Sequence, residues 1–310
     1  MIKYIFKRFI LGIIVLWVVA SLTFFLAHAI PGGPFDFEKQ LPEEILNNLN
    51  AKYNLDKPVT QQYVQYMKDL LRGDFGPSFR YSTETVNEII ARAFPVSATI
   101  GVLALTLAIM LGIPAGIIAA LKQNKWQDDI TMVATTLLIS VPNFVLATLL
   151  MYVFAYKLRL VPAALWGMPS QAILPTIALT GYPLAYITKL TRSSTLEVMG
   201  QDYIRTAKAK GMPSRIVIYV HAIKNSILPI ITILGPIFTS ILMGSLVVEK
   251  IFAIPGLGQH LISGILNRDY TVIMGITIFY SFILIISLLI VDIAYVIVDP
   301  RIKLEGDAKR

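Results

Sequence analysis

Long apolar stretches without charge alternate with short charged stretches along most of this chain. The predicted spans cover residues 9–30, 93–121, 130–156, 171–190, 225–248 and 270–291, which contain no Asp, Glu, Lys or Arg apart from Lys189 near the end of the fourth. A helix rises about 1.5 Å per residue, so about 20 apolar residues cross the hydrocarbon core of a membrane. The pattern predicts an all-α, polytopic membrane protein with six transmembrane helices.

The Lys and Arg residues of the short loops predict the orientation of these helices. If the N-terminus is inside, the inside loops contain most of these residues, with the largest group between residues 189 and 224. The short outside loops contain only Lys157, Arg159, Lys250 and Arg268. Because short cytoplasmic loops of membrane proteins are enriched in Lys and Arg, both termini are expected inside.

This topology divides the chain into three parts. We expect residues 1–30 to form a short cytoplasmic N-terminus and the first transmembrane helix. Residues 31–95 would be an extracytoplasmic segment, and residues 96–310 a core of five transmembrane helices with a cytoplasmic loop at about 193–224. Ala27-His28-Ala29 is similar to a signal-peptidase site. The apolar run before it is about 22 residues long, longer than a signal-peptide core, which favours an uncleaved helix.

Composition agrees with a membrane protein and excludes several kinds of site. The 310 residues are 55% hydrophobic and 15% charged, and the mean hydropathy is +0.67. The chain has no cysteine, so disulfides and thiolate metal sites are excluded. The net charge of +8 comes from loops beside the predicted spans, so nucleic acid is not an expected partner. His28, His221 and His260 fall on different sides of the predicted topology, too scattered for a metal triad.

The extracytoplasmic segment has a pattern of short helices and turns. Residues 42–54 and 60–71 are two short amphipathic segments, and GDFGP at 73–77 has the residues of a tight turn. Residues 31–34, PGGP, are expected to end the first helix with a turn. Two interpretations stay open, a packed cap over the helix ends and a docking surface for an external partner.

A basic segment between the fourth and fifth predicted spans contains a short two-faced helix. Tyr203, Ile204 and Ala207 fall in one sector of about 100°, whereas Arg205 and Lys208 lie on another side. Gly211 is placed as a glycine that ends a helix, with Pro213 soon after, and Ser214 is a candidate N-cap of the next helix. The apolar face suits a groove on another protein. The alternative is a basic loop that lies on anionic lipid.

Nine motifs, taken together and in order, resemble the oligopeptide, dipeptide and nickel branch of ABC-importer permeases, and most closely the first of the two oligopeptide permease subunits. They are AIPGGP (29–34), YNLDKP (53–58), GDFGPS (73–78), DYIRTAKAKG (202–211), HAIKN (221–225), LP (228–229), EKIFAIPGLG (249–258), NRDYTVIMG (267–275) and VDPR (298–301). The resemblance covers nearly the whole chain and implies the ABC importer permease fold, in the cell membrane of a bacterium.

The resemblance also implies the site and the partners. In that family the DYIRTAKAKG region is the helix that couples the permease to its ATPase. The corresponding residues are Asp202, Tyr203, Ile204, Arg205, Thr206, Ala207, Lys208, Ala209, Lys210 and the loop glycine Gly211. The implied partners are a second homologous permease, two ABC ATPases and an extracytoplasmic substrate-binding lipoprotein. One departure is Arg205-Thr206-Ala207, where the general permease signature has Glu-Ala-Ala.

The chain has no ATP-binding motif of its own. No GxxxxGK[ST] sequence occurs, so ATP and Mg²⁺ would be used by the partner ATPases and this chain would bind no cofactor and catalyse no reaction. Gly256-Leu257-Gly258 is interpreted as a loop turn, and GIPAG at 112–116 as a close-packing or kink site. Pro142, Asn143, Gly235 and Pro236 lie within predicted spans and are candidate pathway or hinge residues.

The function expected from the sequence is therefore ATP-driven import of oligopeptides, with this chain as one permease subunit. The same machinery for dipeptides, nickel or another small solute is the nearest alternative. A secondary transporter or channel without ATPases is a different class, and no inverted repeat supports it. A membrane-embedded enzyme would need a nucleophile and base or a metal cluster, and neither is evident.

Overall fold

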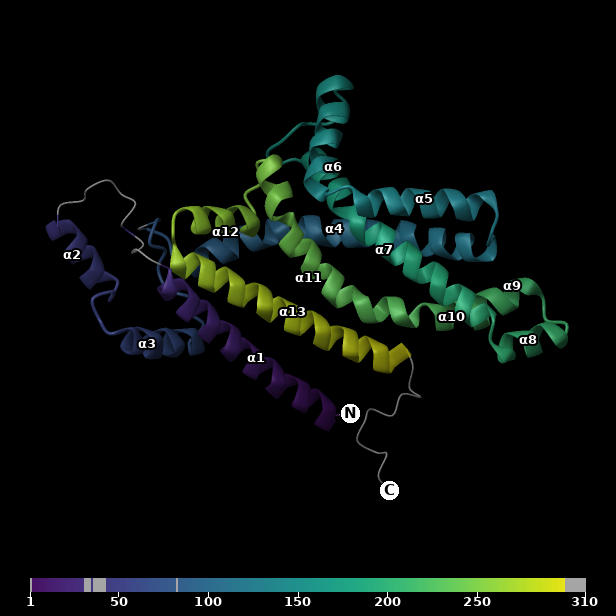
Figure 1. Ribbon diagram of the computed structural model, residues 1–310, viewed down its shortest axis with the longest axis horizontal. Helices are drawn as coiled ribbons and strands as arrows, with labels where there is room; N and C mark the ends of the chain where they lie inside the picture. The colour runs from purple at the N-terminus through teal and green to yellow at the C-terminus, as the bar shows by residue number, and fades with distance from the viewer. Residues whose placement is uncertain (1, 31–34, 36–42, 82, 299–310) are drawn as a thin grey trace. The chain divides into compact units, whose positions relative to one another are not determined.

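The computed structural model of the chain describes residues 2–30, 35, 43–81 and 83–298 (Figure 1). The regular elements in these ranges are helices, accompanied by an isolated bridge between Pro77 and Thr85. They form two compact units, here called the α1 unit (Ile2–Ser97 and Pro255–Ile285) and the α7 unit (mainly Ala98–Ile254 with the chain after Ile286). The predicted PGGP turn at 31–34 and most of VDPR at 298–301 lie outside the described residues.

The α1 unit contains α1 (Ile2–Ala29), α2 (Glu43–Lys52), α3 (Val59–Leu71) and α12 (Leu257–Leu266). The first turns of α4 (Val86–Leu121) and of α13 (Tyr270–Val298) also belong to it. The two short helices expected between the first and second spans are confirmed as α2 and α3. The predicted turn is confirmed as well, with positive φ angles of 76° at Gly73 and 89° at Gly76, which glycine adopts without strain.

Helix α3 packs on the last turns of α1 through aromatic side chains. Phe24 is buried with Met274 and Tyr270, and Tyr63 and Tyr66 of α3 pack against this cluster. The Tyr63 hydroxyl and the Ser21 hydroxyl are hydrogen-bonded at 2.7 Å. Helix α3 is therefore packed on α1, which agrees with the interpretation of a packed cap, and the interpretation of a docking surface is not tested by these contacts.

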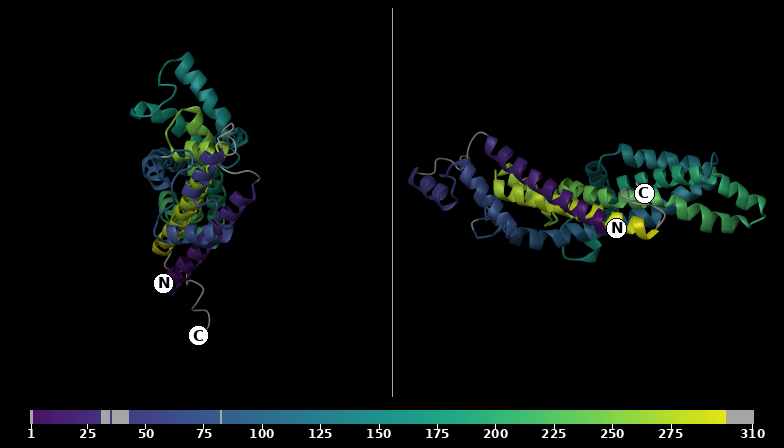
Figure 2. Two further views of the ribbon diagram at one scale, coloured as in Figure 1. Left: turned by 90° about the vertical axis from the view of Figure 1, so that its left-hand side faces the viewer. Right: turned by 90° about the horizontal axis from the view of Figure 1, so that it is seen from below.

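The α7 unit contains the helices that surround α7 (Ile173–Met199). These are α5 (Trp126–Ser140), α6 (Asn143–Leu150), the π-helix η1 (Met151–Lys157), the 3₁₀ turn η2 (Pro169–Ala172), α8 (Asp202–Ala209), α9 (Ser214–Ile216), the π-helix η3 (Val217–Ala222), α10 (Ile223–Ser226) and α11 (Leu228–Ile251). Helix α7 packs against α5, α6 and α11, and Figures 1 and 2 show α5 beside it.

A glycine lets α4 approach α7 closely. A Cβ atom placed on Gly116 would lie 2.6 Å from the Thr188 carbonyl oxygen and 2.6 Å from the Thr191 Cβ. A Cβ on Gly112 would lie 3.2 Å from the Leu184 carbonyl oxygen. The interpretation of GIPAG as a close-packing site is confirmed.

The third predicted span is broken rather than continuous. Helix α5 ends at Ser140 and α6 begins at Asn143, and the axes of Trp126–Ser140 and Asn143–Lys157 differ by 101°. Val141 is extended, with φ −87° and ψ 119°, because the proline ring at Pro142 disfavours helical geometry in the residue before it. Proline also lacks the N–H group that would continue the helix.

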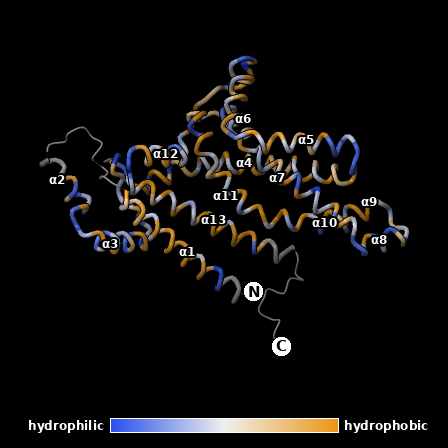
Figure 3. The backbone as a smooth tube through the Cα atoms, viewed as in Figure 1, coloured by the Kyte–Doolittle hydropathy of each residue, from blue (hydrophilic) through white to orange (hydrophobic). Residues whose placement is uncertain are grey.

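The described residues contain four single helices that meet the length and hydropathy required of a membrane span, within α1, α4, α11 and α13. The bent pair of α5 with α6 and η1 would make a fifth. The sequence predicted six, and the segment that does not qualify is α7. About half of its residues are buried, and it includes five Thr and two Ser, so it carries less hydrophobic surface than a helix that faces lipid. Figure 3 shows hydrophobic colouring along α1 and α13 and hydrophilic segments in α3 and α8.

The interpretation of Gly256-Leu257-Gly258 as a loop turn is wrong. Gly256 is the N-cap of α12, and Leu257 and Gly258 are the first residues of that helix. The Ser97 hydroxyl accepts a hydrogen bond of 2.9 Å from the backbone N–H of Leu257, which satisfies one of the free N–H groups of the first turn. The apolar residues Leu257, Leu261 and Ile265 at helical spacing are the signal that could have predicted α12.

Candidate functional site

Helix α8 has the position and the end predicted from the sequence. It spans Asp202–Ala209, and Gly211 has a φ of +75°. The N–H of Gly211 donates to the Lys208 carbonyl at 3.0 Å, and the N–H of Met212 donates to the Ala207 carbonyl at 3.3 Å. This pair of bonds is a Schellman motif, in which a glycine in the left-handed region ends the helix. The motif turns the chain sharply back toward α9 and η3.

The apolar face of α8 packs inside the chain. Ile204 is fully buried and Ala207 is 7% exposed, and both lie in a cluster with Val217 and Ala222 of η3. Met212 packs on the same cluster. The expectation that this face fits a groove on another protein is therefore wrong for Ile204 and Ala207. Packing of α8 on η3 removes the apolar side chains of both segments from water, which is favourable in proportion to the apolar area buried.

The exposed face of α8 is polar and mostly basic. Tyr203 is 43% exposed, and its hydroxyl accepts a hydrogen bond of 2.9 Å from Asn225. Arg205 lies 3.4 Å from Asp202, and both side chains are largely exposed. The other predicted site residues Thr206, Lys208, Ala209, Lys210 and Gly211 are also exposed. Tyr203 thus lies among positively charged side chains on the exposed face of α8, whose opposite face is packed on η3.

The segment that supports α8 differs from the predicted one at its start. Pro213 rather than Ser214 is the N-cap of α9, and no side chain caps it. Proline at this position presets the backbone for a helix start, so a Ser side chain is not needed for the turn. The following η3 is a π-helix, which widens the turn that carries Val217 and Ala222 toward α8.

A buried ion pair links Arg192 of α7, ten positions before the start of α8, to Asp128 of α5. The Arg192 Nε lies 2.6 Å from Asp128 Oδ1, and its Nη2 lies 2.7 Å from Oδ2. The Asp128 side chain is 4% exposed and that of Arg192 is 23% exposed. The backbone N–H of Asn124 donates to the same carboxylate at 3.1 Å. Bidentate pairs fix geometry as well as charge, so this pair holds α7 and α5 in a defined relative position.

The candidate hinge residues lie at two different kinds of place. Pro142 and Asn143 are at the 101° break between α5 and α6. Pro236 is inside the continuous helix α11. Gly235 is buried, and a Cβ on it would lie 3.0 Å from the Ser287 carbonyl oxygen. The helix is therefore broken at Pro142, whereas Gly235 lies where α11 and α13 approach each other closely.

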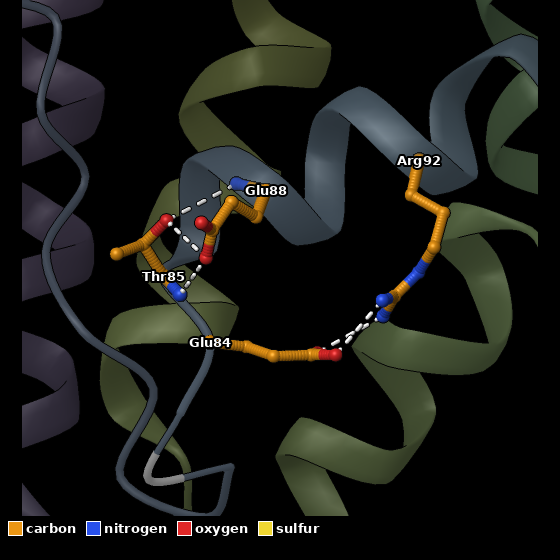
Figure 4. Close-up of polar contacts among 4 residues, drawn as sticks. All are labelled: Glu84, Thr85, Glu88 and Arg92. Atoms are coloured by element: carbon orange, nitrogen blue, oxygen red, sulfur yellow. Dashed lines mark hydrogen bonds and ion pairs between the residues drawn. The ribbon is translucent and has the colours of Figure 1, made fainter.

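The first turn of α4 in the α1 unit has a polar cluster that the sequence analysis did not identify (Figure 4). Thr85 Oγ1 accepts a hydrogen bond from the N–H of Glu88 at 3.2 Å, and the Glu88 carboxylate accepts one from the N–H of Thr85 at 2.8 Å. This is a capping box, and the T-x-x-E sequence was its available signal. Glu84 forms a bidentate pair with Arg92 at 2.8 and 2.9 Å.

In the same unit, Asp269 connects the start of α13 to the loop that contains Ser78. Its carboxylate accepts hydrogen bonds from the Ser78 hydroxyl at 2.5 Å and from the N–H of Val272 at 3.2 Å. The residue is 2% exposed. Asp269 therefore caps α13 and holds the loop around Ser78, which gives a structural reason for two motifs, GDFGPS and NRDYTVIMG.

Two titratable groups in the α1 unit have shifted pKa values. The hydrogen bond from Arg92 is the main cause that lowers the pKa of Glu84. Burial, followed by the positive charge of Arg92, lowers the pKa of His260. Within the described ranges no group of three or more His, Cys, Asp or Glu residues could hold a metal ion.

Comparison with known proteins gives full-length relatives. A family described as "Binding-protein-dependent transport system inner membrane component" matches residues 112–304, and its N-terminal counterpart matches residues 1–101. The chain is 49% identical to the dipeptide transport system permease protein DppB of Bacillus subtilis, covering 98% of this chain and 99% of that protein. It is 43% identical to the oligopeptide transport system permease protein OppB of Salmonella typhimurium, covering 98% and 100%.

A solved structure described as an amino acid ABC transporter with histidines has a TM-score of 0.46 and 18% identity, covering 69% of this chain and 94% of its own. The family matches together cover most of the chain, and the relatives are similar from end to end. The chain therefore belongs to the binding-protein-dependent transport system inner membrane components, the multi-pass permease subunits of ABC importers.

Proposed function

We propose that this chain is one of two permease subunits of an ATP-driven importer of peptides. The observation that carries this proposal is its 49% and 43% identity over nearly full length to a dipeptide and an oligopeptide permease. Because both substrate classes occur among the relatives, the proposal covers peptides in general. The preferred length of the transported peptide is determined by the uptake experiment below.

The proposed partners are a second homologous permease, two ABC ATPases on the cytoplasmic side and an extracytoplasmic substrate-binding lipoprotein. ATP and Mg²⁺ bind to the ATPases, and this chain binds neither. The family description, a membrane component that depends on a binding protein, supports this assembly. The translocation pathway lies between the two permeases.

The proposed topology has six spans with both termini inside. The span that brings the total to six is α7, the fourth in chain order, which has 27 residues and so a length of about 40 Å, enough to cross the membrane. Its low hydropathy fits a helix shielded by neighbours, because α5, α6 and α11 pack around it. The positive-inside pattern supports the orientation. In this topology residues 1–30, 31–95 and 96–310 are the three parts of the chain, and α8 lies in the cytoplasmic loop at about 193–224.

Helix α8 is the proposed ATPase-coupling helix. Its exposed face, with Tyr203, Arg205 and Lys208, would contact the ATPase, and its buried face passes the movement to η3 through Ile204 and Ala207. The end of α7 moves with α8, and the Arg192–Asp128 pair carries α5 with it. The break at Pro142 then allows α5 to tilt without moving α6 rigidly. Closure of the ATPase dimer on ATP would open the pathway outward, and hydrolysis would reset it.

Uptake of labelled peptides in a strain deleted for this chain tests the proposal. The strain must lack any second peptide importer, and the same strain with the chain restored is the control. Loss of dipeptide or pentapeptide uptake on deletion, with recovery on restoration, is the expected result. Unchanged uptake of both peptides would overturn the proposed substrate class, and nickel and other small solutes would be the next to test.

A further inference from the structure

The α1 unit contains a large groove between three helices that has no role in the proposed transport cycle. Its volume is about 960 Å³, at the upper end of the roughly 300–1,000 Å³ of ligand pockets. The lining comes from the middle of α1, one face of α3 and the first half of α13. Lining residues used below are Ile13, Trp17, Val64, Lys68, Leu71 and Phe282.

The walls of the groove are apolar and accessible. Trp17 is 56% exposed, Val64 51% and Leu71 90%. Helices α1 and α13 both have the length and hydropathy of membrane spans, and the family is one of inner-membrane proteins. An apolar groove of this size between two spans therefore opens where lipid acyl chains are available. An acyl chain in the groove would fill the empty space and shield the apolar walls from water.

Lys68 is the one charged residue in the lining. Its side chain is exposed, and no hydrogen bond or ion pair of Lys68 is found among the residues that the structure describes. Of the other polar groups in the lining, the Tyr63 hydroxyl is already paired with Ser21, and the Trp17 indole N–H carries no charge. A lysine can lay its aliphatic part along apolar walls and keep its ammonium at the rim. The groove thus combines a long apolar surface with a single positive charge.

We propose that this groove binds one membrane phospholipid. An acyl chain lies against α1, α3 and α13, and the phosphate is the counter-ion of the Lys68 ammonium. A phospholipid is an abundant membrane molecule with a long apolar chain and a negative phosphate at one end, which matches the lining in both respects. The bound lipid would attach α3, and with it the packed layer of the extracytoplasmic segment, to the membrane. This inference does not depend on which solute is transported.

The test is the number of phospholipids that remain with the purified importer after washing in detergent, measured by native mass spectrometry. Lys68→Glu reverses the charge, and Val64→Trp fills the groove. The matched controls are Lys57→Glu, an exposed lysine outside the groove, and Leu26→Trp, a 65% exposed position of α1 outside it. We expect wild type and both controls to retain one phospholipid per permease copy that both groove variants lose.

Equal lipid retention by all five proteins would overturn the proposal. A second result would also overturn it. The chain has no native cysteine, so a Val64→Cys variant carries a single thiol. If a maleimide–succinimide ester reagent joins that thiol efficiently to a lysine amine of the partner permease in the assembled complex, protein rather than lipid covers the groove. Absence of that cross-link, together with reaction of the thiol with a lipid-soluble maleimide, would support the lipid site.

Discussion

The pair between Asp128 and Arg192 gives the sharpest prediction of stability. Asp128→Asn keeps the size of the side chain and removes its charge, so the Arg192 guanidinium stays 23% exposed without its counter-ion. Coulomb's law gives about 4 kcal/mol for charges about 4 Å apart at an effective dielectric constant of about 20. Breaking a buried pair costs about 3–5 kcal/mol, and hydration of the partly exposed Arg192 reduces this. We expect a loss of about 2–3 kcal/mol.

The loss can be followed with a thiol reporter. Ala185 is fully buried in α7, and Ala185→Cys supplies a single cysteine that reacts with a maleimide only when the α7 unit opens. For a domain of 150–250 residues, 1 kcal/mol shifts the melting temperature by about 2–4 °C, so Asp128→Asn should lower the labelling midpoint by about 5–10 °C. A double change, Asp128→Leu with Arg192→Met, should recover much of the loss because no charge is left unpaired.

The matched control is a bidentate pair of the same chemistry that is exposed. Arg92 and Glu84 have side-chain exposures of 57% and 29%, and such pairs contribute little to stability. Because this pair lies in the α1 unit, its reporter is Ala93→Cys at a fully buried position of that unit, and Glu84→Gln should leave the labelling midpoint of that reporter close to that of wild type. The reasoning is refuted if Asp128→Asn also leaves the midpoint unchanged, or if the apolar double variant is less stable than the single one.

Three further predictions follow from local geometry. Gly116→Ala should cost about 1–3 kcal/mol and lower the same midpoint because its Cβ meets backbone of α7 at 2.6 Å, whereas Gly200→Ala, with its nearest atom at 3.4 Å, should be near neutral. Gly211→Ala meets no atom but has a φ of +75°, so it should cost about 1 kcal/mol and increase hydrogen exchange at the end of α8, which an unchanged exchange rate would contradict. The lowered pKa values of His260 and Glu84 mean that the unfolded α1 unit binds more protons, so this unit should be most stable above pH about 6.5 and lose stability as the pH falls below it. In melts of the complex, His260→Gln should flatten that loss of stability.

Local patterns predicted local structure well. The turn at Gly73 and Gly76, the short helices α2 and α3, and the end of α8 at Gly211 each depend on a few neighbouring residues. The family was also evident, because many short motifs in a fixed order leave few alternatives. Close packing at Gly116 was a correct interpretation for the same kind of reason, since two small residues one turn apart permit helices to approach.

The features that were missed depend on residues far apart in the chain. Asp128 and Arg192 are 64 positions apart, and no local pattern pairs them. The burial of Ile204 and Ala207 depends on η3 folding back on α8, so hydrophobic periodicity located the face but not its partner. Helix α7 was counted among six equal spans, but its packing inside other helices is a tertiary property. In the sequence, Pro142 was the only sign of the 101° break. A proline permits a bend, but the packing of the neighbouring helices sets the angle.

ATP-dependent uptake of a labelled peptide into proteoliposomes that contain the complete importer tests the central claim most directly. Wild type is compared with the Arg205→Glu, Lys208→Glu double variant, whose changes lie on the exposed face of α8 and leave Ile204 and Ala207 in place. We predict uptake that requires ATP on the ATPase side in wild type and is lost in the variant while the permease still assembles in the membrane. Peptide uptake without ATP, or undiminished uptake by the variant, would contradict the account.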